Sequence, residues 1–165
     1  MYTDPILQAY VDLIKAKNGE LKTFFFGEPT RVPVSKLPCV MIAKTGTEVT
    51  KLTNAEDEHA VGISITIIAD IRKELSTGEN DASIVEGVSK LYDLMEGRNA
   101  DFTLKATSVL NILRTNILVS STSQLRTDLR TVTRVSYGET LNNRNPEEWT
   151  IQARLDFVAT FNQVR

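Results

Sequence analysis

The amino-acid sequence predicts an α+β protein: an antiparallel or mixed β-sheet with helices packed on one of its faces. Three stretches carry this prediction. HAVGISITIIADI, from His59, and WTIQARLDFVATF, from Trp149, each place an apolar residue at every second position. Such long alternation, rich in β-branched residues, is typical of strands with one buried face. Between these strands, DASIVEGVSKLYDLMEG repeats apolar residues at helical spacing, which predicts a helix across the sheet.

The chain length favours one domain, 1–165, because a chain of 165 residues buries roughly 68–70% of its unfolded surface in a single core. The net charge of −2 predicts no dominant attraction to nucleic acid or to a membrane. Apolar runs stay well short of about 20 residues, and the first residues lack the features of a signal peptide. We therefore expect a soluble protein that is intracellular when made and has no membrane partner.

The sequence contains no recognisable catalytic, metal-binding or cofactor-binding constellation. Cys39 is the only cysteine and lies among apolar residues, so a buried thiol is expected, and neither an intrachain disulfide nor a thiolate cage can form. His59 is the only histidine and is interpreted as a surface residue at the start of a strand. The acidic run Glu56–Glu58 is interpreted as a solvated loop, since three adjacent residues do not converge on one cation.

The first third of the chain predicts a helix, a strand and an extended loop. Asp4 can cap a helix that starts at Pro5, and Asn18-Gly19 is a typical stop. The segment 21–26 follows as a strand whose three phenylalanines put aromatic area on both faces, to be covered by the chain itself or by a partner. The three prolines in 27–38 then indicate an extended loop.

The next residues predict a short strand, 39–44, a hairpin turn at Thr45-Gly46-Thr47, a polar strand, 48–53, and an acidic loop, 54–58. The central strand and helix follow, and Gly97 can end that helix in the left-handed conformation.

The segment 107–119 fits both helical and strand periodicity, and a short helix over about 104–115 is favoured. A strand over 126–137 and a long loop over 138–148 then lead to the last strand.

Three arginines stand four residues apart, at Arg126, Arg130 and Arg134. On one strand they would project from the same side at intervals of about 13–14 Å. Each one alone is best explained as part of a solvated sheet face, with Asp128, Arg154 and Asp156 as neighbours. The row as a whole favours a contact with acidic residues of another subunit, and phosphates are an alternative because the guanidinium fork fits both anions.

The order of the predicted elements, over most of the chain, and two stretches of sequence resemble the tail terminator proteins of long-tailed bacteriophages. FFFGEPTRVPVSKLPCVMI is similar to the start of such proteins, and LRTDLRTVTRVSYG followed by EEWTIQARLDFVA is similar to their C-terminal strands. The resemblance implies a small α/β sandwich subunit that closes into a hexameric ring on the finished tail tube. It implies as partners the subunit itself, the major tail tube protein and a head-completion or connector protein, with DNA only passing through the lumen.

The same resemblance implies a virion protein of the tail or neck, assembled in the host cytoplasm, with no catalytic residue and no cofactor. Strands with two apolar faces, loops outside the core and the arginine row supply the candidate contacts with neighbouring subunits or the tube. These candidates are Phe25, Arg31, Arg126, Arg130, Arg134 and Arg144. A connector protein of the neck is the alternative function, and a small enzyme is disfavoured by the single histidine and the lone cysteine.

Overall fold

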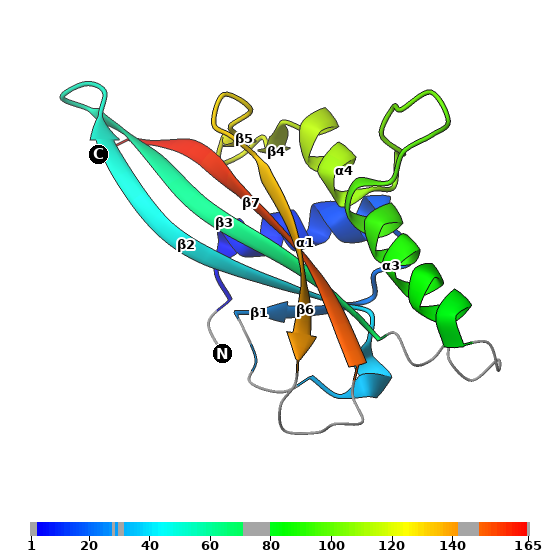
Figure 1. Ribbon diagram of the computed structural model, residues 1–165. Coiled ribbons are helices and arrows are strands. Elements are labelled where there is room, and N and C mark those ends of the chain that lie inside the picture. Colours follow the sequence, from blue (N-terminus) through cyan, green and yellow to red (C-terminus); the bar gives the residue numbers. More distant parts are fainter. Residues whose placement is uncertain (1–2, 28, 30–31, 71–79, 142–148, 165) are drawn as a thin grey trace.

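The computed structural model describes residues 3–27, 29, 32–70, 80–141 and 149–164 (Figure 1). Its elements, in chain order, are α1 (Pro5–Lys17), β1 (Thr23–Phe26), the 3-10 turn η1 (Val34–Lys36), β2 (Cys39–Lys51), β3 (Glu56–Asp70), α3 (Asn80–Glu96), α4 (Val109–Thr115), β4 (Leu118–Ser120), β5 (Leu125–Thr127), β6 (Arg134–Leu141) and β7 (Trp149–Val164).

The described strands form one mixed sheet in the order β1-β2-β3-β7-β5-β4, and β6 pairs with the first half of β7 beside β5. Only β1 and β2 run parallel, and the other described pairs are antiparallel. The predicted α+β class, with a mixed sheet and helices, is confirmed.

The main core lies between the helices and one face of β3 and β7. These two strands pair along their whole lengths, so their odd-numbered residues share the inner face. The buried residues of this face include Ile63, Ile65, Ile67, Ala153, Leu155 and Phe157, and the helices add Tyr10, Ile14, Leu91, Met95 and Leu113. Each large apolar side chain buried here contributes about 1.5–3 kcal/mol relative to exposure. The even-numbered residues lie on the outer face, where polar residues such as Ser64, Thr66 and Arg154 alternate with the core residues, and where Ile68 belongs to a second, smaller apolar cluster.

Helix α1 has the predicted ends. The Asp4 carboxylate accepts hydrogen bonds from the backbone N–H groups of Ile6 (2.9 Å) and Leu7 (3.3 Å). Asn18 ends the helix, and its buried side chain donates to the carbonyl of Thr107 at 2.8 Å. The C-terminal end of α1 is therefore tied directly to the segment that leads into α4.

Strand β1 shows how the chain covers two aromatic faces. Phe24 packs against the main core, and Phe25 packs against a second small cluster of Leu37, Cys39 and Ile68 on the other side. Phe26 is exposed. The chain itself therefore supplies most of the cover that the sequence required for this strand.

The predicted hairpin turn at Thr45-Gly46-Thr47 is wrong. Strand β2 runs through it, and the register shifts only at a bulge between Lys44 and Gly46. Valine and threonine over 47–50 favour extended backbone, and pairing with the long β3 outweighs a weak turn signal. The chain turns at 52–55 instead, so Glu56–Glu58, expected in a loop, belong to β3.

The region after α3 confirms a helix rather than a strand, with a later start. Ser108 caps α4 by accepting from the N–H of Asn111, whereas Leu104 forms a bridge with Arg98. Gly97 does not adopt the expected left-handed conformation, since Gly27 is the positive-φ glycine among the described residues. It is needed for space, because an added Cβ would lie 2.5 Å from the carbonyl oxygen of Asp93.

The single strand predicted over 126–137 is also wrong. The Asp128 carboxylate accepts hydrogen bonds from the N–H of Arg130 (2.9 Å) and the hydroxyl of Thr131 (2.8 Å). These local bonds compete with a strand ladder and bend the chain. The result is two short strands, β5 and β6, which pair with different parts of β7.

Candidate assembly interface

The β2–β3 hairpin and the end of β7 extend away from α3 and α4 as a three-stranded projection (Figure 1). We call residues 46–60 and 160–164 the arm. All of its β2 residues are exposed, and Val49 is 56% and Val164 71% accessible. His59 stacks on Phe161 with ring centroids 4.8 Å apart. Apart from this stacked pair, apolar side chains of the arm such as Val49 and Val164 are exposed to solvent in the single chain.

The outer edge of β2 is open along the arm. Strand β1 pairs only with Cys39–Ile42, and within the described part of the chain no strand pairs with that edge over 43–51. Such an edge presents unpaired N–H and C=O groups and is a template for strand addition. The outer edge of the arm could therefore pair with one more strand.

The arm is acidic. It carries four carboxylates (Glu48, Glu56, Asp57 and Glu58) and one lysine (Lys51), a net charge of −3 with His59 neutral. The register places Glu48, Glu56 and Glu58 on the outer face of the sheet. Alternation along β3 puts Asp57 on the opposite face, so the acidic run does not converge on a single point.

The edge of the sheet away from β2, formed by β4, β5 and the bend into β6, carries a basic and apolar surface, which we call the arginine surface. It consists of the exposed residues Leu118, Arg126, Leu129, Arg130, Val132 and Arg134. Together with Asp128, the segment 118–134 has three arginines and one carboxylate, a net charge of +2. Val132 is 83% accessible and the Arg130 side chain 86%.

The arginines have distinct local partners. Arg126 lies opposite Thr160 on β7, and its guanidinium donates to the side-chain oxygen of Gln124 at 3.2 Å. Arg130 lies 3.4 Å from the Asp128 carboxylate on the bend. Arg134 lies opposite Asp156, which is paired with Arg154 at 3.0 Å. Arg126 and Arg134 therefore share the outer face.

Asp128 fixes the bend that presents Arg130. Burial alone raises the pKa of this carboxyl, but the bonds from Thr131 and Arg130 outweigh burial and hold its pKa below the usual value. The carboxylate is therefore fully ionised at neutral pH. Its hydrogen bonds keep the bend in one conformation.

The structure brings together three of the six residues proposed from the sequence. Arg126, Arg130 and Arg134 gather at one side of the sheet, on two strands and a bend rather than on one strand. Phe25 is half-buried against its own chain. Arg31 and Arg144 lie outside the described residues, as does part of each loop that contains them.

Sequence reasoning missed the arm as a functional feature. The acidic run was interpreted as a loop, because 56–60 carries no apolar alternation that would mark it as a strand. Sequence reasoning also missed the turn that displays Phe102, which is 80% accessible and has a φ of 67°. A carbonyl–guanidinium bond from Arg98 (3.0 Å) and a backbone bond to Asn99 (3.0 Å) hold this turn.

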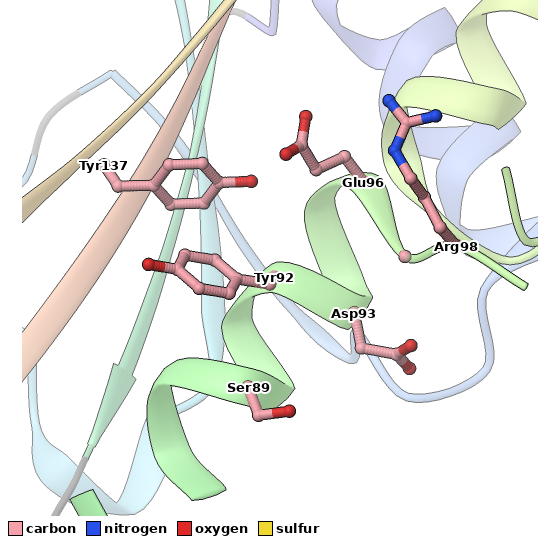
Figure 2. A pocket seen from close by; sticks show the side chains of 7 residues that line it. Ser89, Tyr92, Asp93, Glu96, Arg98 and Tyr137 are labelled. Atoms are coloured by element: carbon pink, nitrogen blue, oxygen red, sulfur yellow. The ribbon is translucent and has the colours of Figure 1, made fainter. Parts of the chain in front are cut away.

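A pocket of about 370 Å³ lies between α3 and β6 (Figure 2). Tyr92 and Tyr137 meet edge to face at 4.6 Å, and the Tyr137 hydroxyl points toward Glu96. Burial, followed by the charge and hydrogen bond of Glu96, raises the pKa of Tyr137, so the phenol stays protonated. The pocket presents an aromatic wall and a carboxylate to solvent, and Ser89, Asp93, Gly97 and Arg98 complete its lining.

The two residues on which nucleophilic chemistry would depend are placed apart from this pocket. Cys39 is buried, as predicted, and burial raises the pKa of its thiol to about 11. His59 is half-buried in the arm, three residues inside β3 rather than at its start. Neither residue lines the pocket.

Two further features are absent from the described part of the chain. No group of three or more histidine, cysteine, aspartate or glutamate side chains there is arranged to hold a metal ion. Within the same residues, no helix combines the length and the apolar character that crossing a bilayer requires.

Comparison with known proteins adds no assignment. No protein-family model matches this chain, and no curated protein matches its sequence.

Proposed function

We propose that this protein is a structural subunit that self-associates into a ring and acts as a tail terminator of a long-tailed bacteriophage. The observation that carries the proposal is the arm, with its open β2 edge and its exposure on both faces. A monomer gains little from such a projection, because its backbone groups and apolar residues stay hydrated. A subunit of an assembly gains from it when a neighbour covers it.

The arm and the arginine surface both combine exposed apolar side chains with charged ones. Val49, Leu52 and Val164 are exposed on the arm, and Leu129 and Val132 on the arginine surface. An apolar patch with a charged rim is the usual composition of a specific protein–protein interface. The surface chemistry therefore supports contacts with protein.

The resemblance of 24–42 and 125–159 to tail terminators supports the specific role. In that role the ring sits on the finished tail tube, stops its polymerisation and offers a surface for joining the head. The partners are then the neighbouring copies, the tail tube protein and a head-completion protein, and DNA passes through the lumen. The proposal gives the protein no catalytic activity and no cofactor, and it places the protein in the virion.

Disruption of the coding gene in a phage that carries it tests this role directly. We expect tails of uneven and excessive length without attached heads, seen by electron microscopy, because polymerisation no longer stops. Supplying the intact protein from a plasmid should restore uniform tails. Tails of normal length beside unjoined heads would contradict termination and favour the neck connector. Normal particles would contradict both roles.

A further inference from the structure

The arm and the arginine surface are complementary in charge. The arm has a net charge of −3, and the segment 118–134 has a net charge of +2. The residues that set these charges include Glu48 on the exposed part of β2 and Arg126 and Arg130 on exposed positions. Opposite surface potentials speed encounter and fix the orientation of two docking surfaces.

The two surfaces are also complementary in position. The open edge of β2 lies on one side of the sheet order, and β6, with the bend before it, pairs with the other side of β7. One molecule therefore presents the open β2 edge of the arm at one side of its sheet and the arginine surface at the other, where Arg126 lies opposite Thr160 of β7. Two copies that join through unlike surfaces leave one free arm and one free arginine surface, so further copies can add. The series of copies forms a ring when the rotation from one copy to the next closes.

Contacts between like surfaces are disfavoured by the same charges. Two arms facing each other would bring Glu48, Glu56 and Glu58 of both copies together, and two arginine surfaces would oppose Arg126, Arg130 and Arg134. Like-charge contacts across an interface suppress the wrong pairing. The exposed valines, Val164 on the outer face of the arm beside Glu56 and Val132 on the bend, give the unlike pairing an apolar centre.

We infer that the arm of one copy docks on the arginine surface of the next copy, head to tail, as the contact that builds the ring. This inference rests on the proposed function, since it takes the partner to be a second copy of this chain. It goes further by naming the two surfaces and the polarity of the contact. It also explains why the bend at Asp128 is held by several hydrogen bonds: the bend positions Arg130 and Val132 for docking.

Cysteine cross-linking tests the polarity of the contact. Val164→Cys and Val132→Cys are made separately, and the native Cys39 is fully buried and stays out of the reaction. On mild oxidation, a mixture of the two variants should give cross-linked dimers, whereas each variant alone should not. A chain with both substitutions should give a ladder that ends in one closed species. Equal cross-linking within either single variant would overturn the head-to-tail contact.

Charge reversal tests the electrostatic part on the same molecules. Glu58→Arg and Arg130→Glu should each weaken association about tenfold or more, and the chain with both changes should recover much of the loss. Lys90→Glu, an exposed change on α3, is the matched control and should leave association unchanged. Circular dichroism melts show that each variant is folded. Association that is insensitive to both reversals would overturn the inference.

These outcomes separate the inference from the proposed function. If the unmodified protein forms a ring, but the cysteine variants do not cross-link as described and the charge reversals do not change association, the named contact is wrong and the ring is still supported. If the unmodified protein is a monomer at every concentration and on tail tubes, both the contact and the ring are wrong. Cross-links between unlike surfaces together with charge recovery support both.

Discussion

Tyr10 is the side chain that ties helix α1 to the strand carrying Arg126. Its hydroxyl lies 3.0 Å from that of Thr127, both residues are buried, and its ring meets Phe157 edge to face at 5.0 Å. Burial raises the pKa of Tyr10 to about 12, so the phenol stays neutral in the core. Each of the two buried hydroxyls has the other as its hydrogen-bond partner, so removing one leaves the other buried and unsatisfied.

Tyr10→Phe should therefore lower the free energy of unfolding by about 1–3 kcal/mol, because the Thr127 hydroxyl is left buried without its partner. Urea denaturation measures the change. The double variant Tyr10→Phe/Thr127→Val should recover part of the loss, since both polar groups are then gone. A single variant as stable as the unmodified protein would show that the pair contributes nothing.

Asp128 makes the bend sensitive to acid. Its pKa is lowered in the folded state, so its contribution to stability is present above the unfolded pKa of about 3.9 and is lost as the pH falls through the lower folded pKa. The protection factor for amide exchange at Arg130, whose N–H is bonded to the Asp128 carboxylate, should therefore fall below about pH 4. In Asp128→Asn this acid-dependent step should disappear. A step that persists in the variant would assign it to another carboxyl.

At the scale of elements, α3 is held by a stripe of buried side chains on its C-terminal half. Leu91, Leu94 and Met95 are buried in the main core, and Val88 packs beside them. This matches the apolar spacing from which the helix was predicted. The side chains of 80–87 lie outside the described residues, so the first half of the stripe stays a prediction.

Leu91→Ala should cost about 2–5 kcal/mol of unfolding free energy, through lost burial and the cavity left in the core. Lys90→Ala is the control on the adjacent exposed position, where a 3.7 Å surface ion pair with Glu20 contributes little. Thermal melts of the two variants give the comparison. Equal melting temperatures would mean that α3 does not pack through Leu91.

The end of α3 depends on the missing side chain of Gly97. Gly97→Ala should destabilise the protein by about 1–3 kcal/mol, because the new methyl group would overlap the Asp93 carbonyl oxygen. Gly19→Ala is the matched control, since nothing lies within 4 Å of its added Cβ. Chemical denaturation should leave the control near the unmodified value. If both variants behave alike, the close approach at Gly97 is relaxed at little cost.

The elements with strong periodicity were predictable from the sequence, and the exceptions have local causes. The alternation of β3 and β7 and the helical spacing of α3 fix which residues are buried, and α1 has clear cap signals. The bend at Asp128 and the bulge before Gly46 were not predicted. Both depend on a choice between local hydrogen bonds or turns and pairing with a distant strand, which single-sequence periodicity does not encode.

The candidate interface was predictable only in part. The arginine spacing identified Arg126, Arg130 and Arg134, but not that a bend separates them. The arm could not be recognised from its sequence, because the feature that distinguishes it is an edge of β2 with no neighbouring strand among the described residues. Exposure of an edge depends on where β1 stops pairing, four residues into β2, and that is a property of the whole sheet.

At the scale of the whole molecule, helices pack on one face of the sheet, whereas its two edges remain exposed. The helices cover the inner face of the sheet (Figure 1). The arm and the arginine surface stay exposed and carry opposite charge. This asymmetry is what a head-to-tail subunit requires. It also predicts that salt weakens assembly, because exposed charges are screened beyond about 8–10 Å at physiological ionic strength.

The most direct test of the central claim is the mass and symmetry of the purified protein, measured by mass photometry and by electron-microscopy class averages, alone and with tail tubes. We expect one closed species of fixed mass with rotational symmetry about a central hole, which dissociates as salt is raised. A monomer at every concentration, free and on tubes, or a simple two-fold dimer would contradict it.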